Sequence, residues 1–171
     1  MTRSVVLGIG NILLSDDGAG VHVARHLEGL LENRTDVQVI DAGTLSFTLA
    51  PVIEDADRLI VIDAAQLHAA PGTVRTYFGS EFDSFLGKAK LTVHEVGLVD
   101  LIDIARLMDA VPAQRAIVAV QPLCATWGST LTKDVDAAVP EIVSRVLELL
   151  DEWPASCDPA VPVTATAASP S

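Results

Sequence analysis

Four short runs of mostly apolar residues constrain the fold of this chain more than any other feature. They cover residues 5–9, 37–40, 59–62 and 116–120. Each run has the length of one strand, and a nearly continuous apolar run is typical of a strand that is buried on both faces of a parallel sheet. We therefore predict a central, mostly parallel sheet.

The segments between these runs have a different pattern. From residue 20 on, apolar residues recur at helical spacing, and we expect further helices from residue 45, over 98–108 and over 133–153. Pro140 is expected to kink the last helix or to mark its beginning. Residues 71–78 alternate around a turn signal and predict an antiparallel edge strand. The whole pattern predicts an α/β fold in which helices cover both faces of a twisted, mostly parallel sheet.

Composition indicates one folded domain followed by a tail. The chain has 171 residues, of which 50% are hydrophobic, and this is enough for one domain with a substantial core. We expect residues 1–153 to form that domain. Residues 154–171 are rich in Pro, Ala, Ser and Thr, and we expect them to be disordered. Cys124 and Cys157 lie far apart in the sequence, so no structural disulfide is expected.

The charge of the chain argues against two classes of partner. There are 23 acidic and 11 basic side chains, which give a formal net charge of −12. A surface this acidic repels nucleic acid and anionic lipid. No apolar run approaches the roughly 20 residues that span a bilayer, and the first residues lack the layout of a signal peptide. We therefore expect a cytoplasmic protein that binds neither nucleic acid nor membranes.

Acidic residues gather where the predicted strands end. Asp41 and Asp63 follow the second and third runs, and Asp16 and Asp17 lie in the loop after the first. In open parallel sheets this edge binds ligands, and a cluster of carboxylates there is costly unless a cation binds or a proton is shared. His94 is placed to reach the same edge. Two carboxylates and an imidazole suit a divalent transition metal and leave coordination positions open for water or substrate.

Each of these residues also has an ordinary structural explanation. Asp17 is a candidate helix cap, Asp41 a candidate turn former, and a single histidine before a helix, such as His94, is commonly structural. The metal-site hypothesis therefore depends on the whole group. Two histidines four residues apart, His22 and His26, lack the glutamate of an HExxH motif and are expected on a solvated helix face.

Two better-known α/β sites fit the first loop poorly. A dinucleotide-binding fingerprint requires a third glycine where this chain has Leu13, and Asp16 and Asp17 would repel the pyrophosphate. A receiver domain of bacterial signalling also gathers aspartates around magnesium. It requires a lysine at the end of the last strand, however, and this chain has Gln121 there. The loop is therefore interpreted as a site for a cation.

Several motifs together resemble the nickel–iron hydrogenase maturation endopeptidases. They are GIGNILLSDDGAGVHVARHLE at 8–28, DAGT at 41–44, LIVIDAA at 59–65, HEVGLVDLI at 94–102, AVQP at 119–122 and GSTLT at 128–132. The resemblance covers about residues 4–153. It implies a three-layer α/β sandwich, in agreement with the fold expected from the strand pattern.

The resemblance also implies an activity and a site. Enzymes of this family remove a short C-terminal extension from the hydrogenase large subunit after nickel has been inserted. By resemblance, Asp17, Asp63 and His94 are the catalytic and nickel-binding residues, although some members of the family have Glu at the position of Asp17. The nickel arrives with the precursor of the large subunit, so no permanently bound metal is expected. The metal would polarise the scissile carbonyl or lower the pKa of a bound water.

Further roles follow from the same resemblance, and alternatives stay open. The DAGT segment is linked to substrate recognition through Asp41, Gly43 and Thr44. A carboxylate that does not bind the metal, Asp16 or Asp41, is a candidate general base. The protein is expected to be monomeric. An assembly checkpoint that binds the nickel-loaded subunit without cutting it would use the same residues, and a hydrolase with its own resident metal is a third hypothesis.

Overall fold

The structure is a computed structural model that describes residues 2–88 and 93–153, with the backbone alone for 93–96. Its centre is a five-stranded sheet in the order β2-β1-β3-β5-β4. Four strands are parallel: β1 (Ser4–Ile9), β2 (Val37–Gly43), β3 (Arg58–Ala64) and β5 (Gln114–Val120). The edge strand β4 (Val74–Phe78) pairs antiparallel with β5. The predicted mostly parallel sheet with one antiparallel edge is therefore confirmed.

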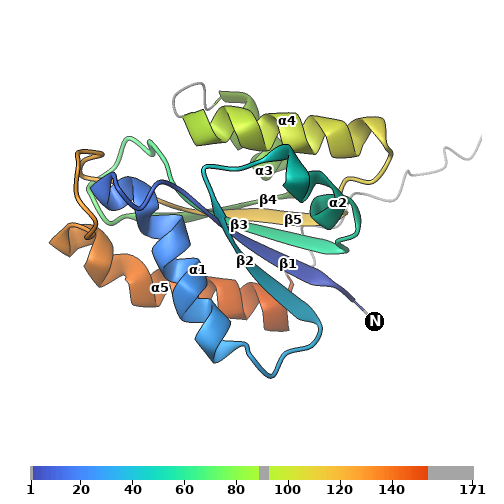
Figure 1. Cartoon of the computed structure of the whole chain (residues 1–171), viewed down its shortest axis with the longest axis horizontal. Helices are drawn as coiled ribbons and strands as arrows, with labels where there is room; N and C mark the ends of the chain where they lie inside the picture. The colour runs from blue at the N-terminus through green and yellow to red at the C-terminus, as the bar shows by residue number, and fades with distance from the viewer. Residues whose placement is uncertain (1, 89–92, 154–171) are drawn as a thin grey trace, which may run out of the picture.

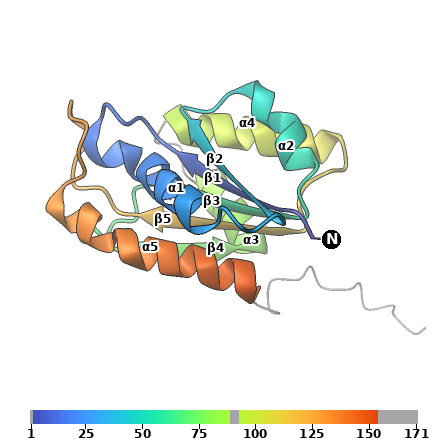
Figure 2. The same ribbon diagram turned by 60° about the horizontal axis from the view of Figure 1, so that its bottom comes forward.

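Helices cover both faces of this sheet, which makes three layers (Figures 1 and 2). One face carries α1 (Ala19–Leu30) and α5 (Lys133–Asp151). The other carries α2 (Ala50–Glu54), α3 (Gly79–Lys88) and α4 (Val93–Leu107). Two short 3₁₀-helices precede α1 and α2, namely η1 (Ser15–Gly18) and η2 (Phe47–Leu49).

Each face of the sheet has its own buried apolar cluster, because successive side chains of a strand point to opposite faces. The side chains toward α1 and α5 include Val6, Ile60 and Val118. Those toward α2, α3 and α4 include Leu7, Val61 and Ile117. The central strands are covered on both sides, which is why their sequences are nearly continuous apolar runs.

Four details differ from the sequence-based expectations. β2 extends to Gly43, so Asp41 lies inside the strand and not beyond its end. α4 begins at Val93, so His94 lies in its first turn and not before it. α3 is an additional helix that the apolar pattern after the edge strand does not predict. α5 begins at Lys133 and continues through Pro140, so the alternative in which Pro140 marks the beginning of the helix is wrong. Burial of the apolar face of α5 offsets the cost of about 3 kcal/mol for a proline inside a helix.

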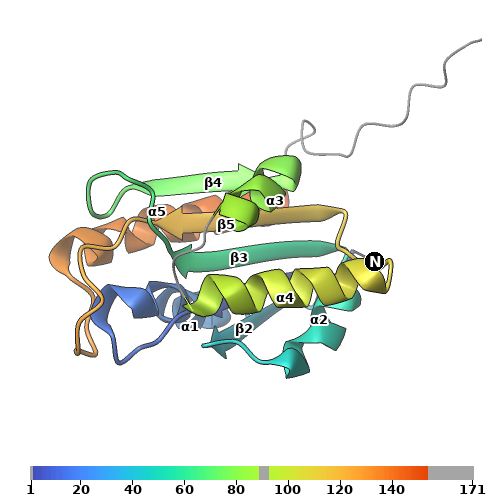
Figure 3. The ribbon, with the colours of Figure 1, turned by 90° about the horizontal axis from the view of Figure 1, so that it is seen from above.

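The parallel strands all end at one edge of the sheet, which we call the carboxyl edge. Figure 3 shows that the loop between β1 and α1 and the loop between β5 and α5 both lie at this edge. Ligands of open α/β sheets bind there. Within residues 2–88 and 93–153, none of the helices has the length and apolar character required to cross a membrane.

Candidate functional site

Two glycines allow the first loop to fold tightly against the carboxyl edge. A Cβ at Gly10, whose φ is +143°, would lie 1.9 Å from the carbonyl oxygen of Asp17. A Cβ at Gly20 would lie 2.2 Å from the carbonyl oxygen of Ile62 and 2.3 Å from that of Ile9. The first turn of α1 therefore lies directly on the ends of β1 and β3, and η1 contacts β3. This close packing brings Asp17 to the end of β3.

Asp17 is not a helix cap. The N-cap residue of α1 is Gly18, and no side chain caps that helix. The Asp17 Oδ2 atom instead accepts a hydrogen bond from the Asn11 amide at 3.1 Å, back across the loop. The side chain is buried, so its carboxylate is held in place by the loop that surrounds it.

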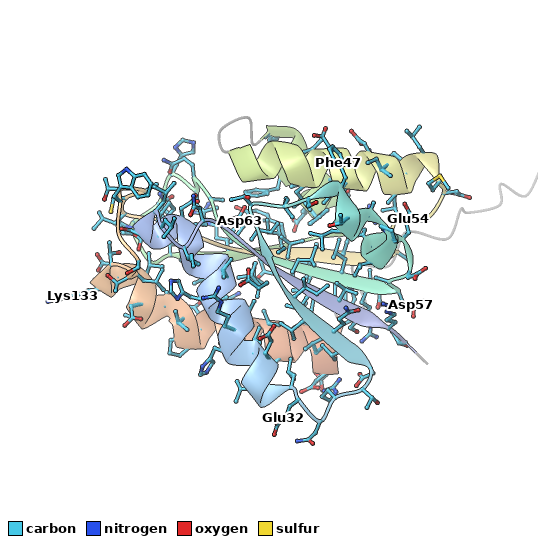
Figure 4. The ribbon with its side chains drawn as sticks, viewed as in Figure 1. Glu32, Phe47, Glu54, Asp57, Asp63 and Lys133 are labelled. Carbon is cyan, nitrogen blue, oxygen red and sulfur yellow. The ribbon has the colours of Figure 1, made fainter. Side chains whose placement is uncertain are left out.

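Asp63 lies in the second-last position of β3, opposite Ala119 of β5, and is buried. It shares the sheet face of Leu59 and Val61, which is the face covered by α2, α3 and α4. Figure 4 labels Asp63 at the end of the sheet that carries the first loop. A buried carboxylate on a rigid central strand is a well-fixed candidate ligand.

His94 belongs to the layer that covers this face. Its backbone lies in the first turn of α4. Three residues later, a Cβ at Gly97 would lie 3.4 Å from the Leu45 side chain, so this part of α4 lies beside the segment that follows DAGT. The side chain of His94 is outside the described part of the structure, so its predicted role as a ligand stays a prediction.

Asp16 has a different environment from its neighbour Asp17. It is fully buried, and its Oδ1 accepts a hydrogen bond from the Thr132 amide at 2.7 Å. Its Oδ2 accepts hydrogen bonds from the Thr132 hydroxyl at 2.8 Å, the Leu123 amide at 2.9 Å and the Cys124 amide at 3.4 Å. These contacts fasten the first loop to the loop before α5. A carboxylate engaged in this way is poorly placed as the general base that the sequence suggested.

Asp41 does not join the other acidic side chains, although the sequence predicts that it lies close to Asp63. Its Oδ2 accepts hydrogen bonds from the Arg25 Nε at 3.0 Å and Nη2 at 2.8 Å, and its Oδ1 accepts one from the Gly43 amide at 3.1 Å. It lies on the α1 side of the sheet. Residues 37, 39 and 41 of β2 point to the same face, and Val37 and Val39 pack against the apolar cluster on that side. Asp63 lies on the opposite side, so the structure does not bring these two carboxylates together.

The DAGT segment nevertheless adjoins the first loop. The Gly10 amide donates a hydrogen bond to the Gly43 carbonyl at 2.8 Å. Gly43 has a φ of +51°, and a Cβ added there would meet no other atom within 4 Å. Thr44 follows it at an exposed position. The predicted recognition segment therefore lies at the carboxyl edge, although its role in recognition is untested.

The described side chains do not form a complete metal site by themselves. Among residues 2–88 and 97–153, no three histidine, cysteine or acidic side chains come together as a group that could hold a metal ion. Asp17 and Asp63 offer two oxygen ligands from adjoining elements. A third ligand has to come from the undescribed part of the chain or from a substrate.

The loop before α5 also belongs to this edge, a placement that the motifs at 119–122 and 128–132 do not predict. Residues 121–132 lie beside the first loop through the Leu14–Gly128 bridge and through the hydrogen bonds of Asp16. One signal was available in the sequence, since these twelve residues, QPLCATWGSTLT, include no charged side chain.

Comparisons with known proteins identify a family that this chain resembles. A family described as "Hydrogenase maturation protease" matches residues 21–149. The hydrogenase expression/formation protein HupD of Rhizobium leguminosarum bv. viciae is 32% identical over 152 residues, which cover 88% of this chain and 75% of HupD. The hydrogenase 2 maturation protease of Escherichia coli is 31% identical over 151 residues, which cover 88% of this chain and 92% of that protein.

Solved structures show the same similarity in three dimensions. The hydrogenase maturating endopeptidase HybD from E. coli superimposes with a TM-score of 0.80 at 30% identity, covering 88% of this chain and 93% of HybD. The [NiFe] hydrogenase maturation protease HybD from Thermococcus kodakarensis gives a TM-score of 0.73 at 27% identity, covering 86% and 99% of the two chains.

Proposed function

Since this chain belongs to the hydrogenase maturation protease family and is a peptide-bond hydrolase, we propose that it cleaves the precursor of a nickel–iron hydrogenase large subunit. The bond cut is the one that releases the C-terminal extension, after nickel has been inserted. The proposal is supported by relatives named as hydrogenase maturation proteases and by the motifs of the first loop, β3 and α4.

The metal is proposed to be part of the substrate. Asp17 and Asp63, two buried carboxylates on adjoining elements, would bind the nickel of the precursor, and His94 would supply an imidazole from the first turn of α4. Oxygen and nitrogen ligands of this kind suit a divalent first-row metal. Burial of carboxylates is costly unless a positive charge or hydrogen bonds compensate it, and an arriving cation supplies such compensation. This pair of buried acids is the observation that carries the proposal.

The metal, when bound, would polarise the scissile carbonyl or lower the pKa of a water. The residues of this chain would position it. Asp63 is fixed by the central strand, and Asp17 is oriented by the Asn11 amide at 3.1 Å. Asp16 and Asp41 are engaged by four and three hydrogen bonds, so neither is retained as the base. Without nickel the ligand set is incomplete, which would make cleavage conditional on metal insertion.

The proposal is tested by intact-mass spectrometry of a large-subunit precursor, with and without nickel, before and after addition of this protein. We expect loss of a C-terminal peptide only from the nickel-loaded precursor. Asp17→Asn, Asp63→Asn and His94→Ala should each lower the rate more than about 100-fold, since even groups that only support metal ligands contribute about 10–100-fold. Asp55→Asn, at an exposed position of the opposite edge, is the matched control and should cleave normally.

Other outcomes would replace the proposal. A stable complex with unchanged mass under these conditions would indicate a checkpoint that binds without cutting. Cleavage of nickel-free precursor at the same rate would contradict a metal supplied by the substrate. Cleavage that survives all three substitutions would mean that the site lies elsewhere.

A further inference from the structure

Two loops of the carboxyl edge form a short parallel pair. The Gly128 amide donates to the Leu13 carbonyl at 3.0 Å, and the Ser15 amide donates to the Gly128 carbonyl at 2.7 Å. The Ser15 hydroxyl donates to the Thr126 carbonyl at 3.0 Å. Leu14 and Gly128 are bridge partners in parallel register, so Leu13 and Trp127 are neighbours across the pair.

This loop pair exposes large apolar side chains. Trp127 is 82% exposed, Leu123 56% and Leu13 52%. We call these three residues the apolar rim. Single exposed apolar side chains are common, but a group of them on adjoining segments marks a binding surface.

The two segments that carry the apolar rim are uncharged, although the chain as a whole is strongly acidic. Residues 121–132 contain no charged side chain, and neither do residues 10–15. The two charged residues that follow, Asp16 and Asp17, are buried. Depletion of charge together with an exposed tryptophan is the composition found at the centre of protein interfaces. An uncharged occupant avoids the repulsion that the net charge of −12 imposes on acidic partners.

The apolar rim is also held in place before any partner arrives. The buried carboxylate of Asp16 accepts hydrogen bonds from the Leu123 amide and from Thr132, at the two ends of the loop that carries Trp127. Fixing a contact surface in advance lowers the entropy lost on binding. The same 3₁₀-helix that contributes Asp16 contributes Asp17, so the apolar rim and the candidate site are parts of one rigid unit.

We propose that the apolar rim is the docking surface for an uncharged, apolar segment of the protein substrate, and that docking there presents the scissile region to Asp17 and Asp63. This inference rests on the proposed function and deepens it. It places part of the specificity in hydrophobic contacts outside the metal site, on Leu13 of the first loop and on Leu123 and Trp127, which lie between the motifs at 119–122 and 128–132.

The test compares Trp127→Ser and Leu13→Ser with Leu107→Ser. Leu107 is 86% exposed at the end of α4, away from the carboxyl edge, so it matches the exposure without belonging to the apolar rim. For the nickel-loaded precursor, Trp127→Ser should raise Kd and KM about tenfold or more, as truncation of a tryptophan anchor commonly does. Leu13→Ser should raise them less. The change should appear in KM and not in kcat, and Leu107→Ser should behave as the unsubstituted protein.

Fluorescence provides a second readout. Binding of the precursor should shift the emission of the unsubstituted protein to shorter wavelength as Trp127 leaves water, and this shift should be missing in Trp127→Ser. Unchanged Kd and KM in Trp127→Ser, or equal losses in Leu107→Ser, would overturn the docking inference. If the unsubstituted protein neither binds nor cleaves the precursor, the proposed function itself fails, so the two failures are distinguishable.

Sedimentation of the free protein tests a second copy of this chain as the occupant. A dimer that Trp127→Ser converts to a monomer would assign the apolar rim to self-association and overturn the proposal. A monomer with and without the substitution supports it.

Discussion

Two groups of acidic side chains at opposite edges of the sheet are held in opposite ways. At the edge where the parallel strands begin, which we call the amino edge, aspartates pair with arginines near the surface, as in Arg3–Asp55 at 3.5 Å and Arg106–Asp103 at 2.5 Å. At the carboxyl edge, Asp16 is buried, and within the described structure its hydrogen-bond donors are three backbone amides and one hydroxyl, all uncharged.

This difference indicates what each edge does. Exposed ion pairs contribute little to the free energy of unfolding, about 0–1 kcal/mol. The buried carboxylate of Asp16 accepts four hydrogen bonds and so holds two loops in one arrangement. A buried amide left without an acceptor there would cost the free energy of its desolvation. The carboxyl edge therefore has rigid loops around Asp17 and Asp63, whereas the amino edge has replaceable surface pairs.

The largest effect on stability is expected from a glycine of the carboxyl edge, Gly10, when it is compared with Gly29 near the amino edge. Gly10→Ala would place a Cβ 1.9 Å from the Asp17 carbonyl oxygen at a φ of +143°, and we expect it to lower the free energy of unfolding by about 3 kcal/mol or more. Gly29→Ala, in the last turn of α1 near the amino edge, has open space around its Cβ and should stabilise by about 0.5–1 kcal/mol. Chemical denaturation measures both. Equal effects would contradict tight packing of the first loop.

The next effect concerns the buried acid itself. Asp16→Ala should lower the free energy of unfolding by roughly 3 kcal/mol, because the amides of Leu123 and Thr132 lose their acceptor. Asp55→Ala, which removes an exposed partner of Arg3 at the amino edge, should change it by less than about 0.5 kcal/mol. Urea denaturation of the two variants checks the contrast. A loss in Asp16→Ala as small as in Asp55→Ala would mean that the two loops do not depend on this carboxylate.

The smallest effect is expected at the amino edge and depends on pH. The Arg34 guanidinium donates two hydrogen bonds to Asp36, at 2.9 Å each, and holds the pKa of that carboxyl below its ordinary value of 3.8. The pKa of Asp36 is lower in the folded than in the unfolded protein. The ion pair therefore adds to the free energy of unfolding above pH 3.8, and this contribution is lost as the pH falls through the pKa of the folded state.

Asp36→Asn should therefore lower Tm slightly near neutral pH, and the difference from the unsubstituted protein should disappear in strong acid. Thermal unfolding followed by circular dichroism over a pH series measures this difference. A gap that stays constant down to the lowest pH would show that the carboxylate charge is not its cause.

The candidate site shows how far the sequence can be interpreted by itself. The motif of the first loop and the aspartate near the end of β3 are visible in the sequence, because each lies within one short segment. Asp16 and Asp17 look equivalent in the sequence, yet Asp16 binds residues 107 to 116 positions away, which no local pattern contains. Asp41 was placed at the acidic edge because its strand was predicted to end at residue 40. The strand continues, and its alternation turns Asp41 toward Arg25.

Local sequence pattern was sufficient to predict the α/β fold, the antiparallel edge strand, the family and the group of candidate ligands, because these depend on periodicity and on motifs within short segments. Three relations became visible only in three dimensions: which acids share a face of the sheet, which acid fastens the loops, and the position of Leu13 beside Trp127. Those relations depend on the register between strands and on contacts between loops more than a hundred residues apart, and a linear pattern does not specify them.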